Sequence, residues 1–371
     1  MPTANEMLGP STVQALAHML TAVAPQRADH ITAAPDQLAG LAMRQRVNLV
    51  ADALLEDLGP NYADLADTVR HAAAMEPDGF SGWLIWPVTE AVARCAVADG
   101  GDHAFRDALA LLAELTHRFS SEFAIRILLN HNVDAALSTI NTWPSAQDEH
   151  IRRLASEGTR PFLPWGQRVP QLQADPEATL PILSALQDDP SPYVRRSVSN
   201  HLNDLSRNHP DLVVATARQW LVEPGTHTAG TVKHALRSLI KQGHPEALAV
   251  MGYGSATVDI RGPHVAESPL TWGGTLTFTV TLRNDDVAPA RLLIDYVIHH
   301  LKANGTTSPK TFKWTTAKLA PGQTLTLTRE HSFREITTRT YYPGVQAVAV
   351  QVSGVSCPPV EFSLLPRDSP S

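Results

Sequence analysis

One helical stretch of the sequence carries polar residues whose spacing could serve chemistry. Residues 193–207 have apolar positions every three or four residues, and Arg196, Asn200 and Asp204 recur every four residues on a second face. Asp204 would lie in the last turn, where the helix macrodipole disfavours a carboxylate by roughly a few tenths of a kcal/mol or more. An acid placed against this preference either has a chemical use or forms an ordinary ion pair with Arg196 or Arg207.

Two further acids lie close to cations or at a helix start. Glu157 has Arg153 one turn before it and Arg160 three residues after it, and Glu122 is predicted to open a helix. A surface ion pair worth less than about 1 kcal/mol would account for Glu157. The favourable dipole of a first helical turn would account for Glu122. Both carboxylates therefore remain candidates for catalysis beside these simpler interpretations.

A tryptophan lies in a segment that cannot be helical. Residues 160–166 contain two prolines and a glycine around Trp165, which predicts a loop. The indole is then either a plug over the core of the helical region or a platform for the apolar face of a ligand.

The sequence gives no sign of a metal or a cofactor. Its sixteen histidines are scattered, and it contains no HExxH, P-loop, dinucleotide fingerprint or nucleophile elbow. The two cysteines, Cys95 and Cys357, offer no CxxC spacing and indicate a reducing compartment. The first residues lack a basic region followed by an apolar one, and no run of about 18 apolar residues occurs. We therefore expect a cytoplasmic protein with no metal, no cofactor and no membrane association.

The elements that must position these side chains are short amphipathic helices joined by links rich in Pro, Gly, Asp and Ser. Pro192 suits a first turn, and Ser191 could cap the helix that follows. A β-branched residue precedes a cation at four places, 26, 43 and 38 residues apart. This irregular repeat predicts a HEAT-like α-solenoid. The expected helices are 12–23, 38–58, 63–75, 89–98, 105–116, 122–129, 135–142, 147–156, 177–187, 193–206, 211–221, 231–241 and 245–250.

The pattern changes near residue 252. Residues 275–282 alternate strictly between apolar and polar, as a half-buried strand does, and 291–299, 324–328 and 345–352 continue the β pattern. About seven short strands predict an immunoglobulin-like β-sandwich. The predicted fold is thus multidomain, α then β, with a HEAT-like repeat domain at 1–250, a sandwich at 251–366 and a tail at 367–371.

Charge is segregated along the chain. The formal net charge is −7, but residues 1–149 hold 8 arginines, no lysine and 19 acids, whereas the two later parts each carry a small positive excess. Any polyanion should therefore bind the later part of the chain.

Two blocks of sequence resemble one enzyme family. Residues 149–166 (Glu-His-Ile-Arg-Arg-Leu-Ala-Ser-Glu-Gly-Thr-Arg-Pro-Phe-Leu-Pro-Trp-Gly) and residues 193–204 (Tyr-Val-Arg-Arg-Ser-Val-Ser-Asn-His-Leu-Asn-Asp) resemble the AlkC branch of the AlkC/AlkD HEAT-like-repeat DNA glycosylases. Residues 301–305, 309–314 and 331–344 resemble the immunoglobulin-like domain of one AlkC subgroup. The resemblance extends over most of residues 1–250.

The resemblance implies removal of cationic alkylated bases, N3-methyladenine and N3-methylcytosine, from duplex DNA without full base flipping. It implies Glu122, Glu157 and Asp204 as catalytic acids, with Trp165 against the deoxyribose. Arg153, Arg160, Arg195 and Arg196 would hold the DNA backbone, together with Asn200 on the polar stripe. It also favours a second DNA contact through basic and aromatic residues of the sandwich, although lysines on edge strands also prevent aggregation. These residues are Lys310, Lys313, Arg329, Arg334 and Arg339, with Trp314, Tyr341 and Tyr342.

The chemistry of the residues agrees with this implication. A cationic base leaves as a neutral molecule, so carboxylates beside the oxocarbenium-like sugar matter more than a general acid. The expected partner is alkylated duplex DNA at the bacterial nucleoid, and a monomer is the default state. The alternative is a non-catalytic HEAT-repeat scaffold that binds a protein or nucleic acid through its concave face.

Overall fold

The computed structural model describes residues 2–254 and 257–367, which form two compact units. One unit comprises the residues up to His209 together with Gln219–Ala235, and the other comprises Pro210–Arg218 together with the residues from Leu236 onward. The predicted boundary at residue 250 stays a prediction. Of the predicted tail, only Arg367 lies within the described residues. Among the helices that the structure describes, none has the length and apolar character needed to cross a membrane.

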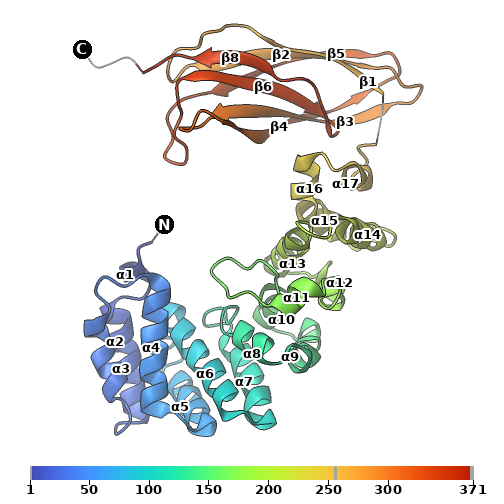
Figure 1. The fold of residues 1–371 in the computed structure, drawn as a ribbon. Coiled ribbons are helices and arrows are strands. Elements are labelled where there is room, and N and C mark those ends of the chain that lie inside the picture. Colours follow the sequence, from blue (N-terminus) through green and yellow to red (C-terminus); the bar gives the residue numbers. More distant parts are fainter. Residues whose placement is uncertain (1, 255–256, 368–371) are drawn as a thin grey trace. The chain divides into compact units, whose positions relative to one another are not determined.

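The first unit consists of short helices in succession (Figure 1). Its α-helices are α1 (Ala4–Met7), α2 (Pro10–Val23), α3 (Asp29–Ala33), α4 (Met43–Leu58), α5 (Tyr62–Met75), α6 (Ile85–Asp99), α7 (Asp102–Leu115), α8 (Ile125–His131), α9 (Val133–Ile140), α10 (Glu149–Glu157), α11 (Pro170–Ala174), α12 (Leu180–Leu186), α13 (Pro192–Leu205) and α15 (Thr228–Ala235). Three 3₁₀ helices, η1 (Ala34–Gln37), η2 (Gly82–Leu84) and η3 (Trp143–Ser145), lie between them.

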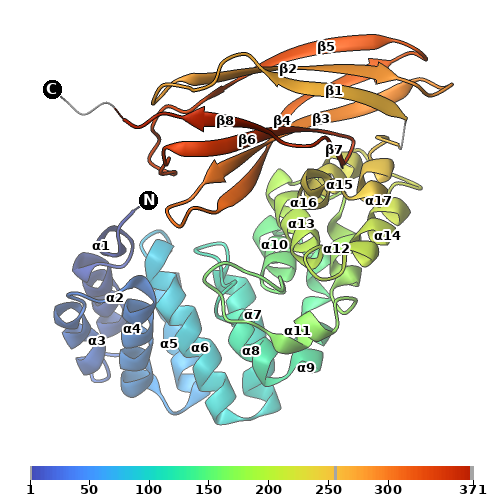
Figure 2. The ribbon, with the colours of Figure 1, turned by 45° about the horizontal axis from the view of Figure 1, so that its top comes forward.

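These helices stack against their neighbours in the way a repeat protein requires. Helix α6 packs against α4, α5, α7 and α8, and α10 packs against α13, which in turn packs against α15. Figure 2 shows the same succession from a second direction. The apolar stripe of α13 is fully buried at Val194, Val198 and Leu202. The predicted HEAT-like solenoid is confirmed, and it places the segment after α7 beside α10 and α13.

Three local predictions for the helical part of the chain are wrong. Glu122 does not open a helix, because residues 121–124 form turns and α8 begins at Ile125. Ser191 is the N-cap residue of α13 but makes no side-chain capping bond, since its hydroxyl donates to Glu149 instead. The helix expected at 231–241 is two helices that are separated at Leu236.

The second unit contains a β-sandwich and three helices, α14 (Pro210–Trp220, up to Arg218), α16 (Arg237–Gln242) and α17 (Pro245–Val250). One sheet has the order β1-β2-β5, and the other has the order β4-β3-β6-β7 with β8 paired to β6. The strands are β1 (Val258–Val265), β2 (Thr275–Asn284), β3 (Ala290–Leu301), β4 (Thr307–Leu319), β5 (Thr324–Ser332), β6 (Gly344–Val352), β7 (Val355–Ser356) and β8 (Val360–Leu364).

The sandwich core comes from the alternating residues of both sheets. Leu276, Phe278 and Val280 of β2 are fully buried, while the threonines between them are half-buried, so the strict alternation of this strand is confirmed. Two aromatic residues expected at a DNA surface pack on this core instead. Tyr341 is buried within it, and Trp314 is half-buried and packs edge-on against Phe278.

A pair of buried histidines lies inside this sandwich. The imidazoles of His300 and His331 are 6.1 Å apart between ring centroids, and a hydrogen bond joins the Tyr296 hydroxyl to Nδ1 of His331. The side chain of Gln346 is the polar group that interacts with the ring of His300. Burial, followed by the nearby charge of Arg339, lowers the pKa of His300 to about 3 and that of His331 to about 4.

Acidification should therefore destabilise the sandwich. The pKa values of both histidines are lower in the folded state than the usual 6.5. As the pH falls below 6.5, both histidines are therefore protonated in the unfolded chain but stay neutral in the folded protein, which favours unfolding. Between pH 7 and pH 5 each histidine should cost about 2 kcal/mol of unfolding free energy. The measurement is urea unfolding at both pH values, followed through hydrogen exchange of β3 and β5. His300→Phe should remove about half of the loss, and an equal loss in that variant would contradict this account.

Candidate active site

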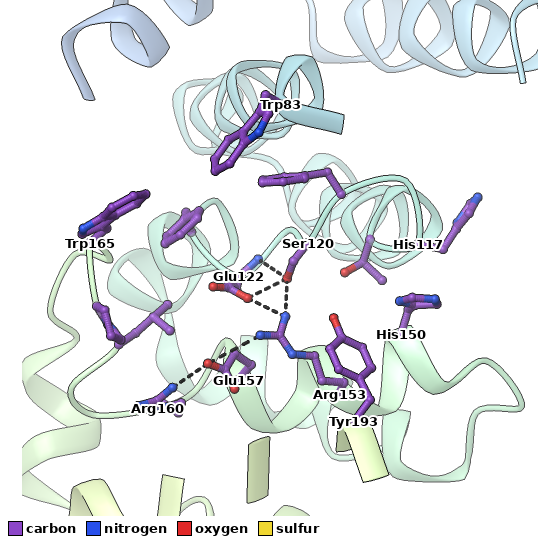
Figure 3. Close-up of a pocket in the computed structure, with 15 residues that line it drawn as sticks. Trp83, His117, Ser120, Glu122, His150, Arg153, Glu157, Arg160, Trp165 and Tyr193 are labelled. Atoms are coloured by element: carbon purple, nitrogen blue, oxygen red, sulfur yellow. Dashed lines mark hydrogen bonds and ion pairs between the residues drawn. The ribbon is translucent and has the colours of Figure 1, made fainter. Parts of the chain in front are cut away.

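A cavity of about 530 Å³ opens on the helical unit where the turn before α8, helix α10 and the loop after it come together (Figure 3). It takes its side chains from segments far apart in the sequence. The lining residues are Trp83, Thr116, His117, Phe119, Ser120, Glu122, Phe123, His150, Arg153, Glu157, Arg160, Leu163, Pro164, Trp165 and Tyr193. Three of the four predicted catalytic residues, Glu122, Glu157 and Trp165, therefore line one cavity.

Carboxylates and guanidinium groups alternate across the floor of this cavity. Arg153 bonds Glu122 at 2.5 Å and approaches Glu157 to 3.5 Å. Arg160 bonds Glu157 at 2.6 Å through Nη1 and Asp204 at 2.9 Å through Nε. The result is a continuous series, Glu122–Arg153–Glu157–Arg160–Asp204, which we call the charge ladder. Because it has three acids and two cations, the ladder itself carries a net negative charge.

Two acids of the ladder are deeply buried, so each needs a cation beside it. Glu157 is 5% exposed and Asp204 is 3% exposed. Burial alone would raise the pKa of Glu157, but the charges of Arg153 and Arg160 outweigh it and lower this pKa below its ordinary value. Glu157 is therefore an anion at neutral pH. A surface ion pair does not describe it.

Asp204 occupies a different position from the other two acids. It lies in the last turn of α13 and accepts from Arg160, but it does not line the cavity. Its expected partners Arg196 and Arg207 are replaced by Arg160, and the guanidinium of Arg207 lies over the ring of Phe162 instead. Asp204 thus acts on the cavity through Arg160.

An aromatic wall forms one side of the cavity. Trp165 is 62% exposed and lies parallel to the buried Trp86, with 6.4 Å between ring centroids and 7° between planes. Trp86 stacks in turn on Phe123 at 4.2 Å, and Trp83 packs against Phe119 at 4.7 Å. An indole this exposed is not a plug over the core. Its position fits a platform for an apolar ligand face.

The opposite side of the cavity carries residues that the sequence did not single out. Figure 3 shows Tyr193, His150 and His117 on the side of Arg153 that is away from Trp165. The rings of His150 and Tyr193 meet edge-on at 5.6 Å, and the guanidinium of Arg153 lies 5.0 Å from the centre of the Tyr193 ring. Tyr193 directly follows Pro192, the proline that starts α13, and its local sequence gives no signal that it lines a cavity.

Several predicted DNA contacts lie outside this cavity. Arg196 is exposed on α13 and, with Arg195, lines a separate depression of about 380 Å³ that reaches His227 at the start of α15. Arg195 donates to the Pro190 carbonyl at 2.9 Å. Asn200 is half-buried. Arg153 and Arg160, by contrast, are engaged in the ladder, so their observed partners are carboxylates.

Fold and cavity together define a HEAT-like repeat protein with a carboxylate-lined site and a C-terminal immunoglobulin-like domain. Residues 259–366 match the family described as the C-terminal Ig-like domain of YhaZ. The chain is 35% identical to protein YhaZ of Bacillus subtilis over 317 residues, 85% of each chain. It also matches the structure of the Pseudomonas fluorescens alkylpurine DNA glycosylase AlkC bound to DNA containing an abasic-site analogue, with 36% identity, a TM-score of 0.82 and coverage of 98% of this chain and 100% of that one. The protein belongs to the AlkC-like branch, in the subgroup with a C-terminal Ig-like domain, and YhaZ is a member of the same family.

Removing the cation that joins Glu157 to Asp204 should destabilise the fold. Arg160→Met leaves two buried carboxylates short of a partner, and we expect it to lower the free energy of unfolding by about 3–5 kcal/mol in urea denaturation at neutral pH. The double variant Arg160→Met with Asp204→Asn should lose less than Arg160→Met alone, because a buried amide is less costly than an unpaired carboxylate. Simple addition of the two losses would show that the ladder is not coupled.

Proposed function

We propose that this protein is a DNA glycosylase that hydrolyses the N-glycosidic bond of cationic alkylated bases, N3-methyladenine and N3-methylcytosine, in duplex DNA. The observation that carries the proposal is the pair of carboxylates, Glu122 and Glu157, in one cavity with the exposed Trp165. The likeness to the Pseudomonas fluorescens AlkC supports it, since it extends over that entire chain at 36% identity.

The charge of the leaving group determines what the site must supply. An N3-methylated base is already positive and departs neutral, so it needs no proton from a general acid. Positive charge develops instead on the deoxyribose, which becomes oxocarbenium-like. Fixed negative charge beside this sugar stabilises the transition state more than the ground state, and that difference accelerates the reaction.

The cavity residues fit these requirements. Glu157, held as an anion by its two arginines, supplies negative charge at the sugar. Glu122 accepts from the Ser120 hydroxyl at 2.9 Å and lies less buried than Glu157, which suits the carboxylate that orients and deprotonates the attacking water. Trp165 offers its indole face to the cationic sugar, an interaction worth about 1 kcal/mol or more. Asp204 shares Arg160 with Glu157 and so keeps that cation from neutralising Glu157 fully.

Cations outside the ladder would then bind the phosphates of the DNA backbone. Arg195 and Arg196 lie on α13 with Asn200, next to the ladder but beyond the cavity. Planar guanidinium groups suit phosphate because they bind it bidentately. On the sandwich, Lys310, Lys313 and Arg334 are exposed and Arg339 is half-buried, and we propose that they form a second DNA contact. The protein would act on duplex DNA as a monomer at the nucleoid, without flipping the lesion into a base pocket.

Loss of charge within the ladder should separate binding from chemistry. We expect Glu157→Gln and Asp204→Asn to bind duplex DNA as tightly as the unchanged protein but to release methylated bases ~10²-fold more slowly. In Asp204→Asn the reason is indirect, because Arg160 is then free to neutralise Glu157. The measurement is single-turnover release of bases from methylated duplex DNA, identified by chromatography.

The control is Glu114→Gln, which removes an exposed carboxylate from α7 in the same helical unit. Its base release should match that of the unchanged protein. Full release by both ladder variants would remove the catalytic assignment and favour a non-catalytic scaffold.

If cations of the sandwich contact DNA, they should increase the salt dependence of the affinity for duplex DNA. Each phosphate contact adds close to one unit to the slope of log affinity against log salt concentration. Lys310→Ala and Arg334→Ala should each reduce this slope by about 1, measured by fluorescence anisotropy of labelled duplex DNA. Lys318→Ala, an exposed lysine on the same strand as Lys310, is the matched control and should leave the slope unchanged. Unchanged slopes in all three variants would mean that the sandwich does not contact DNA through these cations.

A further inference from the structure

A buried arginine without an ion pair lies beneath the loop that carries Trp165. Arg126 of α8 is 0% exposed, and among the described residues no carboxylate forms an ion pair with it. Its guanidinium donates to three backbone carbonyls instead: to Gly158 at 2.8 Å and Arg160 at 2.9 Å through Nη1, and to Gln167 through Nε. Nη2 has no hydrogen-bond partner within the described residues.

These three carbonyls enclose the loop 161–166. Gly158 and Arg160 precede the loop and Gln167 follows it, so one side chain ties the two ends of the loop together. One helical turn further along α8, Asn130 donates to the carbonyl of Arg168 at 3.0 Å. This hydrogen bond adds a second contact between α8 and the chain that follows the loop. The loop is therefore fastened to one face of α8.

The tip of the loop needs such support. Trp165 has φ of +63°, in the left-handed region that costs a non-glycine residue about 1–2 kcal/mol, and its side chain is mostly exposed. Gly166 allows the loop to lie close to Arg126, since a Cβ at this position would come within 3.1 Å of Cδ of Arg126 and 2.9 Å of a Leu163 methyl group. Strain and exposure would let the indole leave its place if the ends of the loop were free.

Arg126 is a costly way to stabilise a loop. Burial, followed by the nearby charges of Arg168 and Arg160, lowers the pKa of Arg126 to about 10, yet it remains charged at neutral pH. A buried cation with an unmet donor costs free energy that an apolar residue would not. Its planar fork, however, reaches three carbonyls at once, which no apolar side chain can do.

We propose that Arg126 is a positioning residue that fixes loop 161–166 so that the Trp165 indole faces the cavity of Glu122 and Glu157. Its effect on base release rests on the function proposed above, whereas its effect on the loop does not. Arg126→Lys keeps the charge and removes the fork, so it is the informative substitution. The matched control is Arg46→Lys, since Arg46 is also buried and also donates to backbone carbonyls, those of Ala4, Leu8 and Leu41, in the N-terminal helices.

The first measurement is hydrogen exchange of full-length protein, which needs no activity. Arg126→Lys should raise exchange at least about tenfold in peptides that cover residues 158–168 and leave α4 unchanged, and Arg46→Lys should do the reverse. Unchanged exchange across 158–168 in Arg126→Lys would overturn the proposal, whatever the enzymatic activity.

The second measurement is a double-mutant cycle on single-turnover base release. Arg126→Lys alone should slow release by an amount close to that of Trp165→Ala, on the order of 10-fold to 100-fold, with binding of undamaged duplex DNA unchanged. In the Trp165→Ala background, Arg126→Lys should slow release less than about twofold further, because the side chain it positions is gone. Full, multiplicative losses in both backgrounds would show a general structural role instead. If the unchanged protein releases no base at all, the proposed function fails, and the exchange measurement still decides the role of Arg126.

Discussion

The structure of the site depends on the pairing of buried carboxylates with arginines. An isolated buried carboxylate would take up a proton, since its desolvation in a protein interior costs several kcal/mol. In the charge ladder Glu157 stays ionised because Arg153 and Arg160 contact it from two sides. The ladder nevertheless ends in an acid on each side, so two cations are shared by three carboxylates. In the proposed reaction this excess of carboxylates stabilises the positive charge that develops on the sugar as its base leaves, and the charged guanidinium of Arg126, which interacts with Asp204 and Glu122, offsets part of it.

The repeat fold makes this pairing possible. Glu122 comes from the turn before α8, Arg153 and Glu157 from α10, and Asp204 from α13. Stacking of successive helices brings these segments to one face, whereas a single helix could present only residues three and four apart. The chain after α10 then passes over α8. It first supplies Arg160 to the ladder, and loop 161–166 then supplies Trp165 to the cavity. The positions of the three acids and of the Trp165 indole are thus set by the same helices, α8, α10 and α13.

Much of this arrangement could be predicted from sequence, and the failures have physical causes. The apolar stripe of α13 and the strict alternation of β2 are local signals, and both are confirmed by burial. The partner of Asp204 could not be found in this way, because Arg160 lies 44 residues away and local spacing favoured arginines of the same helix. The prediction of Trp314 at a DNA surface fails because the weak alternation of β4 does not reveal that its half-buried ring packs against the sandwich core. The sequence around Arg126 indicates only the helical repeat. No neighbouring residue indicates that its side chain binds the backbone of a loop more than 30 residues away.

The pH dependence of base release tests the central claim most directly. An account with ionised carboxylates and no general acid predicts that single-turnover release of N3-methyladenine, corrected for spontaneous loss, is constant from neutral to alkaline pH. The rate should fall only in acid, below the ordinary pKa range of a glutamate, because the pKa of Glu157 is lowered. A rate that declines as the pH rises through neutrality would mean that a protonated group takes part in bond cleavage. That result would contradict the role assigned to the charge ladder.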